Sequence, residues 1–358
     1  MSLLKVAVVG VGALGRHHAR ILAGMDGVNL FAVADTNPVQ GQAIAEQHGS
    51  RWVSDYRELF QEADAVSLAV PTHAHLAVAS EFLSRRIPVL VEKPIACNLQ
   101  EAEELVRIAE THDTLLQIGH VERFNPATQT AFERCSNPRF IRSERVSPYT
   151  FRSTDIGVIH DLLIHDIDLV LSLVNSPVKS VEAFGVSVMG EHEDAVQARL
   201  RFQNGCIADL TASRISPTAK RTMQLWGASG CVTVDFTSRE VTSYRPSETL
   251  LYGTPPLERA RKAGANVEAL KQDVFGTFLK VDSPEVSAAD ALTAELDSFV
   301  EAIRTNTEPL VGGKQALQAM QVAELVLEAV NRHEWDGSQQ GAVGPFIQFP
   351  AEQRRLAG

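Results

Sequence analysis

The chain has 358 residues, of which 44% are hydrophobic, and this length and composition suit two folded domains better than one. Its formal net charge is −11 at pH 7, so its overall field repels nucleic-acid phosphates and anionic membranes. No apolar stretch is long enough to cross a bilayer, and the N-terminal apolar run leads into glycines rather than a cleavage site. We therefore expect a cytoplasmic protein that binds neither nucleic acid nor membrane.

Strand-like and helix-like patterns alternate through the first third of the chain. Apolar runs typical of strands fall at 5–9, 30–34, 65–70, 89–91 and 115–118. The first and third of these are almost continuously apolar, as parallel strands covered on both faces require. The pattern predicts an α/β fold, a Rossmann-type doubly wound parallel sheet, over residues 1–122.

The strand pattern changes after Phe124-Asn125-Pro126 to a period of two residues. Such runs fall at 181–188, 195–202, 206–213, 223–226 and 231–236. Asn204-Gly205 between two of them is a strong hairpin signal. We predict a C-terminal α+β domain over 123–335, built on a large, mostly antiparallel sheet.

Two amphipathic helices are predicted late in this second domain. Leu292, Leu296 and Phe299 share the apolar face of the first, and a second such pattern begins near Leu317. Residues 238–284 carry no clear pattern and are predicted to form a mobile flap or an interface loop. Residues 336–358 are assigned to a C-terminal tail.

The strand predicted at 5–9 runs directly into Gly10-Val11-Gly12-Ala13-Leu14-Gly15, and a helical pattern follows. This is a G-x-G-x-x-G pattern in the strand–turn–helix setting that dinucleotide binding requires. Gly10 allows the tight turn, Gly12 lets the backbone approach a pyrophosphate, and Gly15 allows close helix packing. We predict that the three glycines, Ala13 and Leu14 bind the cofactor at the helix N-terminus.

Asp35 closes the second predicted strand, 20 residues after Gly15, where a carboxylate accepts hydrogen bonds from the ribose hydroxyls of NAD. It would repel the 2′-phosphate of NADP, and Thr36-Asn37 provides no arginine to offset that repulsion. We predict NAD, with Asp35 and Thr36 beside it. The alternative is that the glycines only form a turn and Asp35 caps a helix. His17 and His18 are expected on the helix surface.

Two further loops follow predicted strands at the sheet edge where such folds bind ligands. Pro71-Thr72-His73-Ala74-His75 follows the run at 65–70, and Glu92-Lys93-Pro94 follows the run at 89–91. The Lys93 ammonium is a candidate proton donor or acceptor near the nicotinamide. Alternatively, Glu92 and Lys93 form a solvated loop pair.

A helix predicted at the start of the second domain carries Asp161 and His165 four residues apart, and therefore on one face. A neighbouring carboxylate fixes the tautomer of an imidazole, so His165 is a candidate base for a substrate hydroxyl. Two alternatives remain: a metal site of His160, His165 and Asp166, and a structural His165 satisfied by the backbone or Asp168. The metal ligands do not converge on one helix face, so no metal is expected.

The four cysteines lie far apart and include no C-x-x-C pair, a spacing that suits neither a zinc site nor a disulfide framework. They are Cys97, Cys135, Cys206 and Cys231. We expect all four to be reduced thiols in the core.

Taken together, the glycine-rich turn, Val70-Pro71-Thr72, Glu92-Lys93-Pro94 and the Asp161-x-x-x-His165 helix resemble the Gfo/Idh/MocA oxidoreductase family over residues 4–332. The resemblance implies that Lys93 and His165 sit beside the nicotinamide and the reacting carbinol carbon, where they act as catalytic and substrate-binding residues together with Asp161. It also implies that Pro71, Thr72, His75 and Glu92 belong to the cofactor site.

A narrower likeness lies in residues 119–127 and 158–168. These segments resemble the branch of the family that oxidises the 3-hydroxyl of UDP-N-acetylglucosamine or its uronic acid. By this likeness, Arg123 stands at the cofactor and Asn125 at the substrate. A nucleotide-sugar also needs cations for its pyrophosphate. The candidates are Arg145, Arg152, Arg214, Lys220 and Arg221.

Two rival functions remain at this stage. A dehydrogenase of a free sugar or an inositol would use the same lysine and histidine without a nucleotide-binding region. A regulator on the same fold would bind NAD or sugar without turnover, although both Lys93 and His165 are present. The resemblance also implies a homo-dimer or homo-tetramer, paired through the outer face of the antiparallel sheet.

Overall fold

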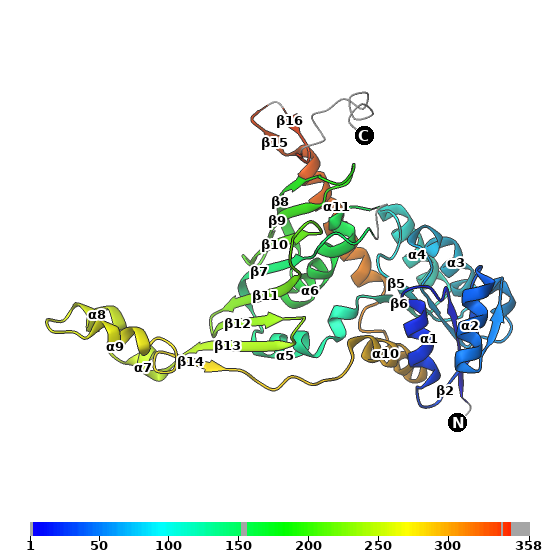
Figure 1. Cartoon of the computed structure of the whole chain (residues 1–358), viewed down its shortest axis with the longest axis horizontal. Helices are drawn as coiled ribbons and strands as arrows, with labels where there is room; N and C mark the ends of the chain where they lie inside the picture. Colours follow the sequence, from blue (N-terminus) through cyan, green and yellow to red (C-terminus); the bar gives the residue numbers. More distant parts are fainter. Residues whose placement is uncertain (1–2, 152–155, 338, 345–358) are drawn as a thin grey trace. The chain divides into compact units, whose positions relative to one another are not determined.

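A computed structural model describes residues 3–151, 156–337 and 339–344 (Figure 1). The chain divides into two compact units. Unit 1 contains residues 1–124 and 289–324, and unit 2 contains residues 125–288 and the chain from 325 onward. The expected division placed the whole of 123–335 in one domain, whereas here 289–324 belongs with the N-terminal unit.

Unit 1 is built on a six-stranded parallel sheet in the order β3-β2-β1-β4-β5-β6, the Rossmann order. Its strands are β1 (Leu4–Val9), β2 (Val28–Ala34), β3 (Arg51–Val53), β4 (Ala65–Leu68), β5 (Val89–Glu92) and β6 (Leu116–Gly119). The five predicted strands and the predicted fold class are confirmed. The short edge strand β3 was not predicted, because three residues that begin with an exposed arginine give no apolar run.

Among the helices of unit 1, α2, α4 and α10 start at residues whose side chains cap the first backbone N–H groups, whereas α1 and α3 have no side-chain cap. Asn37 caps α2 and Asn98 caps α4 through their side-chain oxygens. These helices are α1 (Gly15–Ala23), α2 (Pro38–His48), α3 (His75–Leu83), α4 (Leu99–Thr111) and α10 (Ala291–Thr305). The unit also contains short 3-10 helices at Tyr56–Leu59, Thr72–Ala74 and Val121–Phe124. Helix α11 (Gly313–Arg332) begins in unit 1 and ends in unit 2.

Helix α10 joins unit 1 because its apolar face completes that unit's core. Leu296, Phe299 and Val300 are fully buried in the same cluster as Val6 of β1 and Leu22 of α1. The apolar face itself was predicted correctly, but periodicity does not show which sheet a face packs against.

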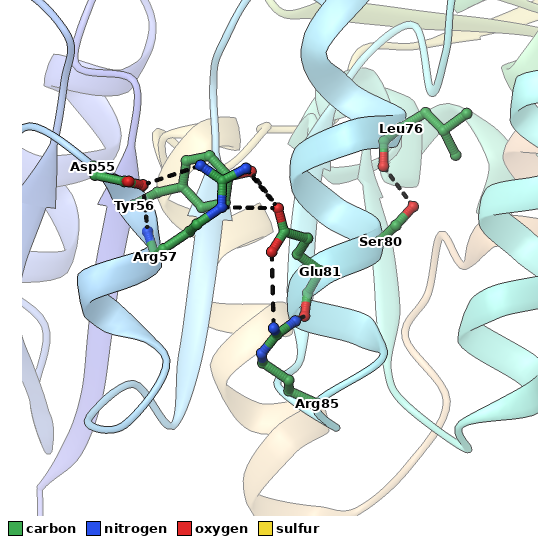
Figure 2. Close-up of polar contacts among 7 residues, drawn as sticks. All are labelled: Asp55, Tyr56, Arg57, Leu76, Ser80, Glu81 and Arg85. Atoms are coloured by element: carbon green, nitrogen blue, oxygen red, sulfur yellow. Dashed lines mark hydrogen bonds and ion pairs between the residues drawn. The ribbon is translucent and has the colours of Figure 1, made fainter.

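A polar contact ties the 3-10 helix Tyr56–Leu59 to α3 (Figure 2). Glu81 accepts hydrogen bonds from the Tyr56 hydroxyl at 2.8 Å and from Arg57 Nη2 at 2.9 Å. Burial and the neighbouring Glu81 carboxylate raise the pKa of Tyr56 to about 12, so its hydroxyl remains a donor at neutral pH. Arg85, one turn after Glu81, pairs with the same carboxylate.

Unit 2 contains an eight-stranded sheet in the order β14-β13-β12-β11-β7-β10-β9-β8, antiparallel except where β7 meets β10. Its strands are β7 (Pro138–Val146), β8 (Val178–Val186), β9 (Ala195–Phe202), β10 (Ile207–Ser213), β11 (Lys220–Gly227), β12 (Gly230–Asp235), β13 (Glu240–Pro246) and β14 (Leu279–Asp282). The predicted mostly antiparallel sheet is confirmed. Gly205 has φ +85° in the β9–β10 turn, where Asn204-Gly205 predicted a hairpin.

Two helices pack on this sheet. Helix α5 (Pro126–Arg134) contacts β12 and β13, and α6 (Ile164–Val174) contacts β7 and β10. A π-helical turn, Ile159–Leu163, leads directly into α6. The two-residue strands β15 (Glu334–Trp335) and β16 (Gln339–Gln340) pair with each other beyond α11.

The segment 238–284, predicted to be a flap or a loop, contains ordered elements. Between β13 and β14 it forms α7 (Glu248–Tyr252), α8 (Pro256–Arg261) and α9 (Val267–Gln272), none of which buries a side chain. Figure 1 shows these helices projecting from the end of β13 and β14. Throughout the described residues, no helix has the length and apolar character needed to cross a membrane.

Candidate functional site

The glycine-rich turn of unit 1 has the geometry that its sequence predicts. Gly10 has φ +82°, and a Cβ there would lie 2.7 Å from the carbonyl oxygen of Ala69. A Cβ on Gly15 would overlap the carbonyl oxygen of Gly10, so α1 packs against the turn only with glycine there. A Cβ on Gly12 would lie 3.9 Å from Gln40 Nε2 and no closer to any other non-neighbouring residue that the structure describes, which leaves room for a pyrophosphate.

The N-terminus of α1 suits the same ligand. Its N-cap residue, Leu14, makes no side-chain capping hydrogen bond, and Leu14 and Ala13 are both exposed. The first backbone N–H groups of a helix bear the positive end of its dipole. This turn therefore fits the pyrophosphate of a dinucleotide by its backbone and its shape.

Asp35 follows β2 and ties that strand to the glycine-rich turn. Its Oδ2 accepts hydrogen bonds from the Val11 N–H at 2.9 Å and from Gln40 Nε2 at 3.1 Å. Its Oδ1 accepts from the Asn37 N–H at 2.8 Å. Each carboxylate oxygen accepts two hydrogen bonds, so Oδ1 retains capacity for a ribose hydroxyl. Asn37, rather than Asp35, caps α2, and Thr36 is exposed beside it.

The two predicted loops at the carboxyl edge of the sheet are joined by His75. This side chain is buried; its Nδ1 lies 2.9 Å from the carbonyl oxygen of Pro94 and its Nε2 lies 3.0 Å from that of Val70. Burial lowers the pKa of His75, although both carbonyl groups favour the charged ring. The neutral ring donates to only one of these carbonyls. The two close contacts place His75 between the loop that follows β4 and the loop that follows β5.

Lys93 lies at the carboxyl end of β5 and is half-buried. Its backbone N–H donates to Glu92 Oε2 at 3.2 Å. Glu92 is buried, and its Oε1 lies 2.9 Å from Nε2 of His18. Because Glu92 is buried, Glu92 and Lys93 do not form the solvated loop pair that was the alternative. In the other loop, Pro71 is exposed and Thr72 half-buried.

The sequence-based placement of His18 on the surface of α1 is wrong. His17 is half-buried, whereas His18 is 0% exposed and faces β4 and β5 through Ser67 and Glu92. Polar neighbours such as Arg16 and Arg20 suggested a solvated helix face, and the partners of His18 are distant in sequence.

In unit 2, Asp161 and His165 lie on either side of the change from π-helix to α-helix. Both are half-buried, whereas the neighbouring Asp166 and Asp168 are buried. Asp161 therefore lies in the π-helical turn and His165 in the first turn of α6. In the part of the chain that the structure describes, no cluster of His, Cys, Asp or Glu is arranged to hold a metal ion.

Two other predicted site residues lie close together in sequence but in different units. Arg123 is half-buried at the end of the 3-10 helix Val121–Phe124 in unit 1. Asn125 begins unit 2 and is buried; its side-chain oxygen accepts the Ala127 N–H at 3.0 Å and caps α5. Asn125 therefore has a helix-capping role in this structure.

Most of the candidate cations for a pyrophosphate already have carboxylate partners. Arg145 pairs with Asp166 at 2.9 Å, and Arg214 pairs with Asp194 at 2.7 Å, both in buried surroundings. Lys220 pairs with Glu144 in an exposed position. Arg221 is exposed, and Arg152 lies outside the described residues. The two buried arginines thus stabilise unit 2 internally.

The prediction of four reduced core thiols is confirmed for three cysteines. Cys135, Cys206 and Cys231 are free and buried, and burial raises the pKa of both Cys206 and Cys231 to about 11. Cys97 is free but exposed, because it lies in the loop after Pro94 rather than in a core element.

Comparison with known proteins identifies both parts of the chain. Residues 4–120 match the oxidoreductase family with an NAD-binding Rossmann fold, and residues 128–233 match the GFO/IDH/MocA C-terminal domain. A UDP-N-acetylglucosamine 3-dehydrogenase from Acidithiobacillus ferrooxidans is 31% identical, covering 91% of this chain and 98% of that protein. Its solved structure, named GnnA, superposes with a TM-score of 0.80 at 30% identity, covering 92% of this chain and 98% of that one.

More distant relatives share the fold. An inositol 2-dehydrogenase from Rhizobium meliloti is 23% identical, covering 91% of this chain and 97% of that protein. A levoglucosan dehydrogenase solved with NADH and levoglucosan has a TM-score of 0.76 at 17% identity, covering 92% of this chain and 97% of that one. The domain matches, the near-full-length relative and the glycine-rich turn together show that the chain is an NAD-binding oxidoreductase of the Gfo/Idh/MocA family.

Proposed function

We propose that the protein oxidises a ring hydroxyl of a sugar, C3 of a UDP-N-acetylglucosamine-type nucleotide sugar, to give a 3-keto sugar. The observation that carries the proposal is the position of Lys93, half-buried at the carboxyl end of β5 in a unit whose glycine-rich turn fits NAD. The activity named for the 31% identical relative supports the choice of substrate.

Each candidate residue has a defined role in this reaction. NAD, when bound, would supply the acceptor for the hydride that leaves the carbinol carbon. His165 removes the hydroxyl proton, and Asp161 holds the imidazole in the tautomer that accepts it. Lys93 polarises the same oxygen or relays its proton. Gly10, Gly12, Gly15 and Asp35 hold the dinucleotide, as do Ala13, Leu14, Thr36, Pro71, Thr72 and Arg123.

The nucleotide part of the substrate requires cations other than the two buried arginines. Arg145 and Arg214 are engaged by Asp166 and Asp194, and releasing either would leave a buried carboxylate unpaired. Among the sequence candidates, Arg221 is exposed and remains the one we assign to the pyrophosphate.

The direct test is NADH absorbance with the purified protein, NAD and UDP-N-acetylglucosamine, repeated with the uronic acid and with free sugars. A parallel reaction with 2-oxoglutarate detects turnover when NADH stays bound. A UDP-dependent rise in NADH supports the proposal. A rise that persists when a free sugar replaces the nucleotide sugar contradicts it. So does the absence of turnover with every nucleotide sugar in both reactions, despite measurable NAD binding.

Replacement of Lys93 or His165 tests the assignment of catalytic groups. Lys93→Met and His165→Asn should each lower kcat by about 10²- to 10⁴-fold, as expected for loss of an acid–base group, with NAD affinity retained. Lys314→Met and His192→Asn are matched controls, because both side chains are exposed in the same units. Unchanged turnover in both catalytic variants would rule out these roles.

Two other functions are distinguished by the same reactions. The family includes inositol dehydrogenases, and turnover of a free inositol or sugar in preference to a nucleotide sugar would identify this alternative. A sensor would bind NAD and sugar without turnover of any substrate.

We also propose a homo-dimer or homo-tetramer that pairs through the outer face of the unit 2 sheet. Phe140 and Trp226 lie there among polar side chains such as Arg142 and Gln224, and Trp226 is 47% exposed. Burial of these aromatic side chains against a second copy would remove apolar surface from water. Sedimentation equilibrium of the purified chain measures this, and a monomer at micromolar concentration would contradict it.

A further inference from the structure

Four elements of unit 1 bring polar side chains together in the interior. His18 on α1, Ser67 on β4 and Glu295 on α10 are each 0% exposed, and Glu92 on β5 is 8% exposed. We call these four residues the buried polar cluster. Polar groups are rarely buried at this density without a structural or chemical reason, because each must recover the hydrogen bonds it loses to water.

Contacts in the cluster lead from Ser67 to the main chain of Lys93. His18 Nδ1 lies 2.7 Å from Ser67 Oγ, and His18 Nε2 lies 2.9 Å from Glu92 Oε1, at a less favourable angle for a hydrogen bond. The other oxygen of Glu92, Oε2, accepts the Lys93 N–H at 3.2 Å. Because a carboxylate only accepts, the ring proton of His18 belongs on Nε2, and the Ser67 hydroxyl donates to Nδ1.

The backbone opposite Glu92 restricts its carboxylate further. Gly119 pairs with Glu92 across β5 and β6, and a Cβ on Gly119 would lie 3.0 Å from Glu92 Oε2. Glu92 is therefore confined on one side by His18 and on the other by the β6 backbone. Small changes at either side would move the residue that immediately precedes Lys93.

Glu295 is the second buried carboxyl group of the cluster. Burial raises the pKa of Glu295 well above its ordinary value, and the charge of Glu92 raises it further. Within the described residues, neither of its carboxyl oxygens has a hydrogen-bond partner. Burial therefore favours the neutral form of Glu295, and the Glu92 carboxyl group is the one that faces His18.

The distances among Ser67, His18 and Glu92 resemble those of a hydrolytic Ser-His-acid triad, but the accessibility does not. Ser67 lies in the centre of the parallel sheet with no exposed surface, so no acyl substrate reaches its hydroxyl. The cluster therefore acts on its own neighbours rather than on a substrate.

We propose that His18 is a positioning residue that acts on Lys93 through Glu92. His18 holds the Glu92 carboxylate, Glu92 holds the Lys93 N–H, and this sets the point from which the Lys93 side chain projects. The inference rests on the proposed function, in which Lys93 is the group that meets the substrate.

Three substitutions at His18 separate positioning from packing. Leucine removes both ring nitrogens, asparagine places its amide near the position of Nδ1, and glutamine reaches the position of Nε2. His18→Leu should lower kcat by about 10- to 100-fold, as a misplacement of about 1 Å does, with the KM for the sugar changed less than about twofold. His18→Gln should restore most of the lost kcat and His18→Asn should not.

His17→Gln is the matched control, because this half-exposed histidine precedes His18 on the same helix. A kcat of His18→Leu within about twofold of the unaltered protein overturns the inference. If His18→Leu does not fold, the comparison of His18→Gln with His18→Asn tests the inference instead. Equal kcat values for these two variants overturn it. Lys93→Met measured in parallel separates the two claims: its full activity refutes the proposed function, whereas its loss beside an active His18→Leu refutes only the positioning role.

Discussion

Units 1 and 2 each place a buried carboxylate directly beside a candidate catalytic residue, but they hold it with different partners. In unit 2, Asp166 follows His165 and is held by Arg145, whose Nη2 lies 2.9 Å from Oδ1 and whose Nε lies 3.2 Å from both oxygens. In unit 1, Glu92 precedes Lys93 and is held by His18 at 2.9 Å. Both carboxylates are buried.

The difference between the partners determines what each carboxylate can do. A guanidinium keeps its charge at every physiological pH and fixes a carboxylate by two hydrogen bonds, so the Arg145–Asp166 pair is a permanent anchor for α6 on β7. An imidazole, unlike a guanidinium, can be neutral or charged according to its surroundings. Unit 1 therefore holds Glu92 with a titratable partner, His18, and buries a second acid, Glu295, whose pKa burial raises.

The largest expected effect tests the permanent anchor. Arg145→Met would leave Asp166 charged and buried without its partner, and should destabilise the protein by about 3–5 kcal/mol in urea unfolding. The double variant Arg145→Met/Asp166→Leu should recover most of this loss. Arg201→Met is the control, because its pair with Glu182 is exposed. A loss below about 1 kcal/mol would show that Arg145 does not anchor Asp166.

The next effect tests the titratable side of the comparison. Glu295→Gln should stabilise the protein at pH 7.5 by about 1–3 kcal/mol, because the buried acid must remain protonated while the unfolded one ionises. Because the pKa of Glu295 is raised in the folded protein, the unaltered protein has its full stability below the pKa of this group in the unfolded state, about 4.3. Its stability declines as pH rises above that value. The advantage of the variant should therefore vanish near pH 4.

Urea unfolding at several pH values measures this difference. The isosteric variant Gln117→Glu, which places a second acid on β6 near α10, should show the opposite sign, since Gln117 is fully buried and donates to the Glu295 carbonyl. A Glu295→Gln variant that is less stable than the unaltered protein at pH 7.5 would show that this acid is ionised and favourably held.

The smallest effect comes from a carboxylate near the surface. Hydrogen bonds from Tyr56, and then from Arg57, lower the pKa of Glu81 in the folded protein. The stability that Glu81 contributes is therefore present above the pKa of the unfolded state and is lost as pH falls through the pKa of the folded state. Glu81→Gln should cost no more than about 1 kcal/mol at pH 7, since solvent screens the pair, and less below pH 4 or in high salt. A larger loss of stability would show that Glu81 anchors its partners as strongly as the buried Asp166 does.

The sequence predicts unit 1 well because its central strands are buried on both faces. Continuous apolar runs identify β1 and β4, and the glycine-rich turn identifies the order of strand, turn and helix. The strand β7 was missed because charged residues, Arg139, Arg142 and Glu144, are distributed along it and obscure the alternation. Strand β14 forms one edge of the sheet, β13 lies next to it, and both contain few apolar residues.

The candidate site was predictable only where a residue's role follows from its own motif. Gly10 and Gly15 have the conformations that their motif requires, because backbone sterics alone fix them. His18 and Glu295 were missed because each looks like an ordinary polar residue on its own helix. Their burial depends on partners contributed by other elements, and no local pattern encodes such partners.

The return of α10 to unit 1 affects the order in which this protein can fold as it is synthesised. Val6, Leu22 and Leu30 share a core cluster with Leu296 and Phe299, which are made only after nearly all of unit 2. Until then, the nascent N-terminal unit exposes an apolar surface and lacks the acid that borders Glu92. The cofactor-binding unit is therefore completed only after residues 125–288 of unit 2 have been made, although its sequence emerges first.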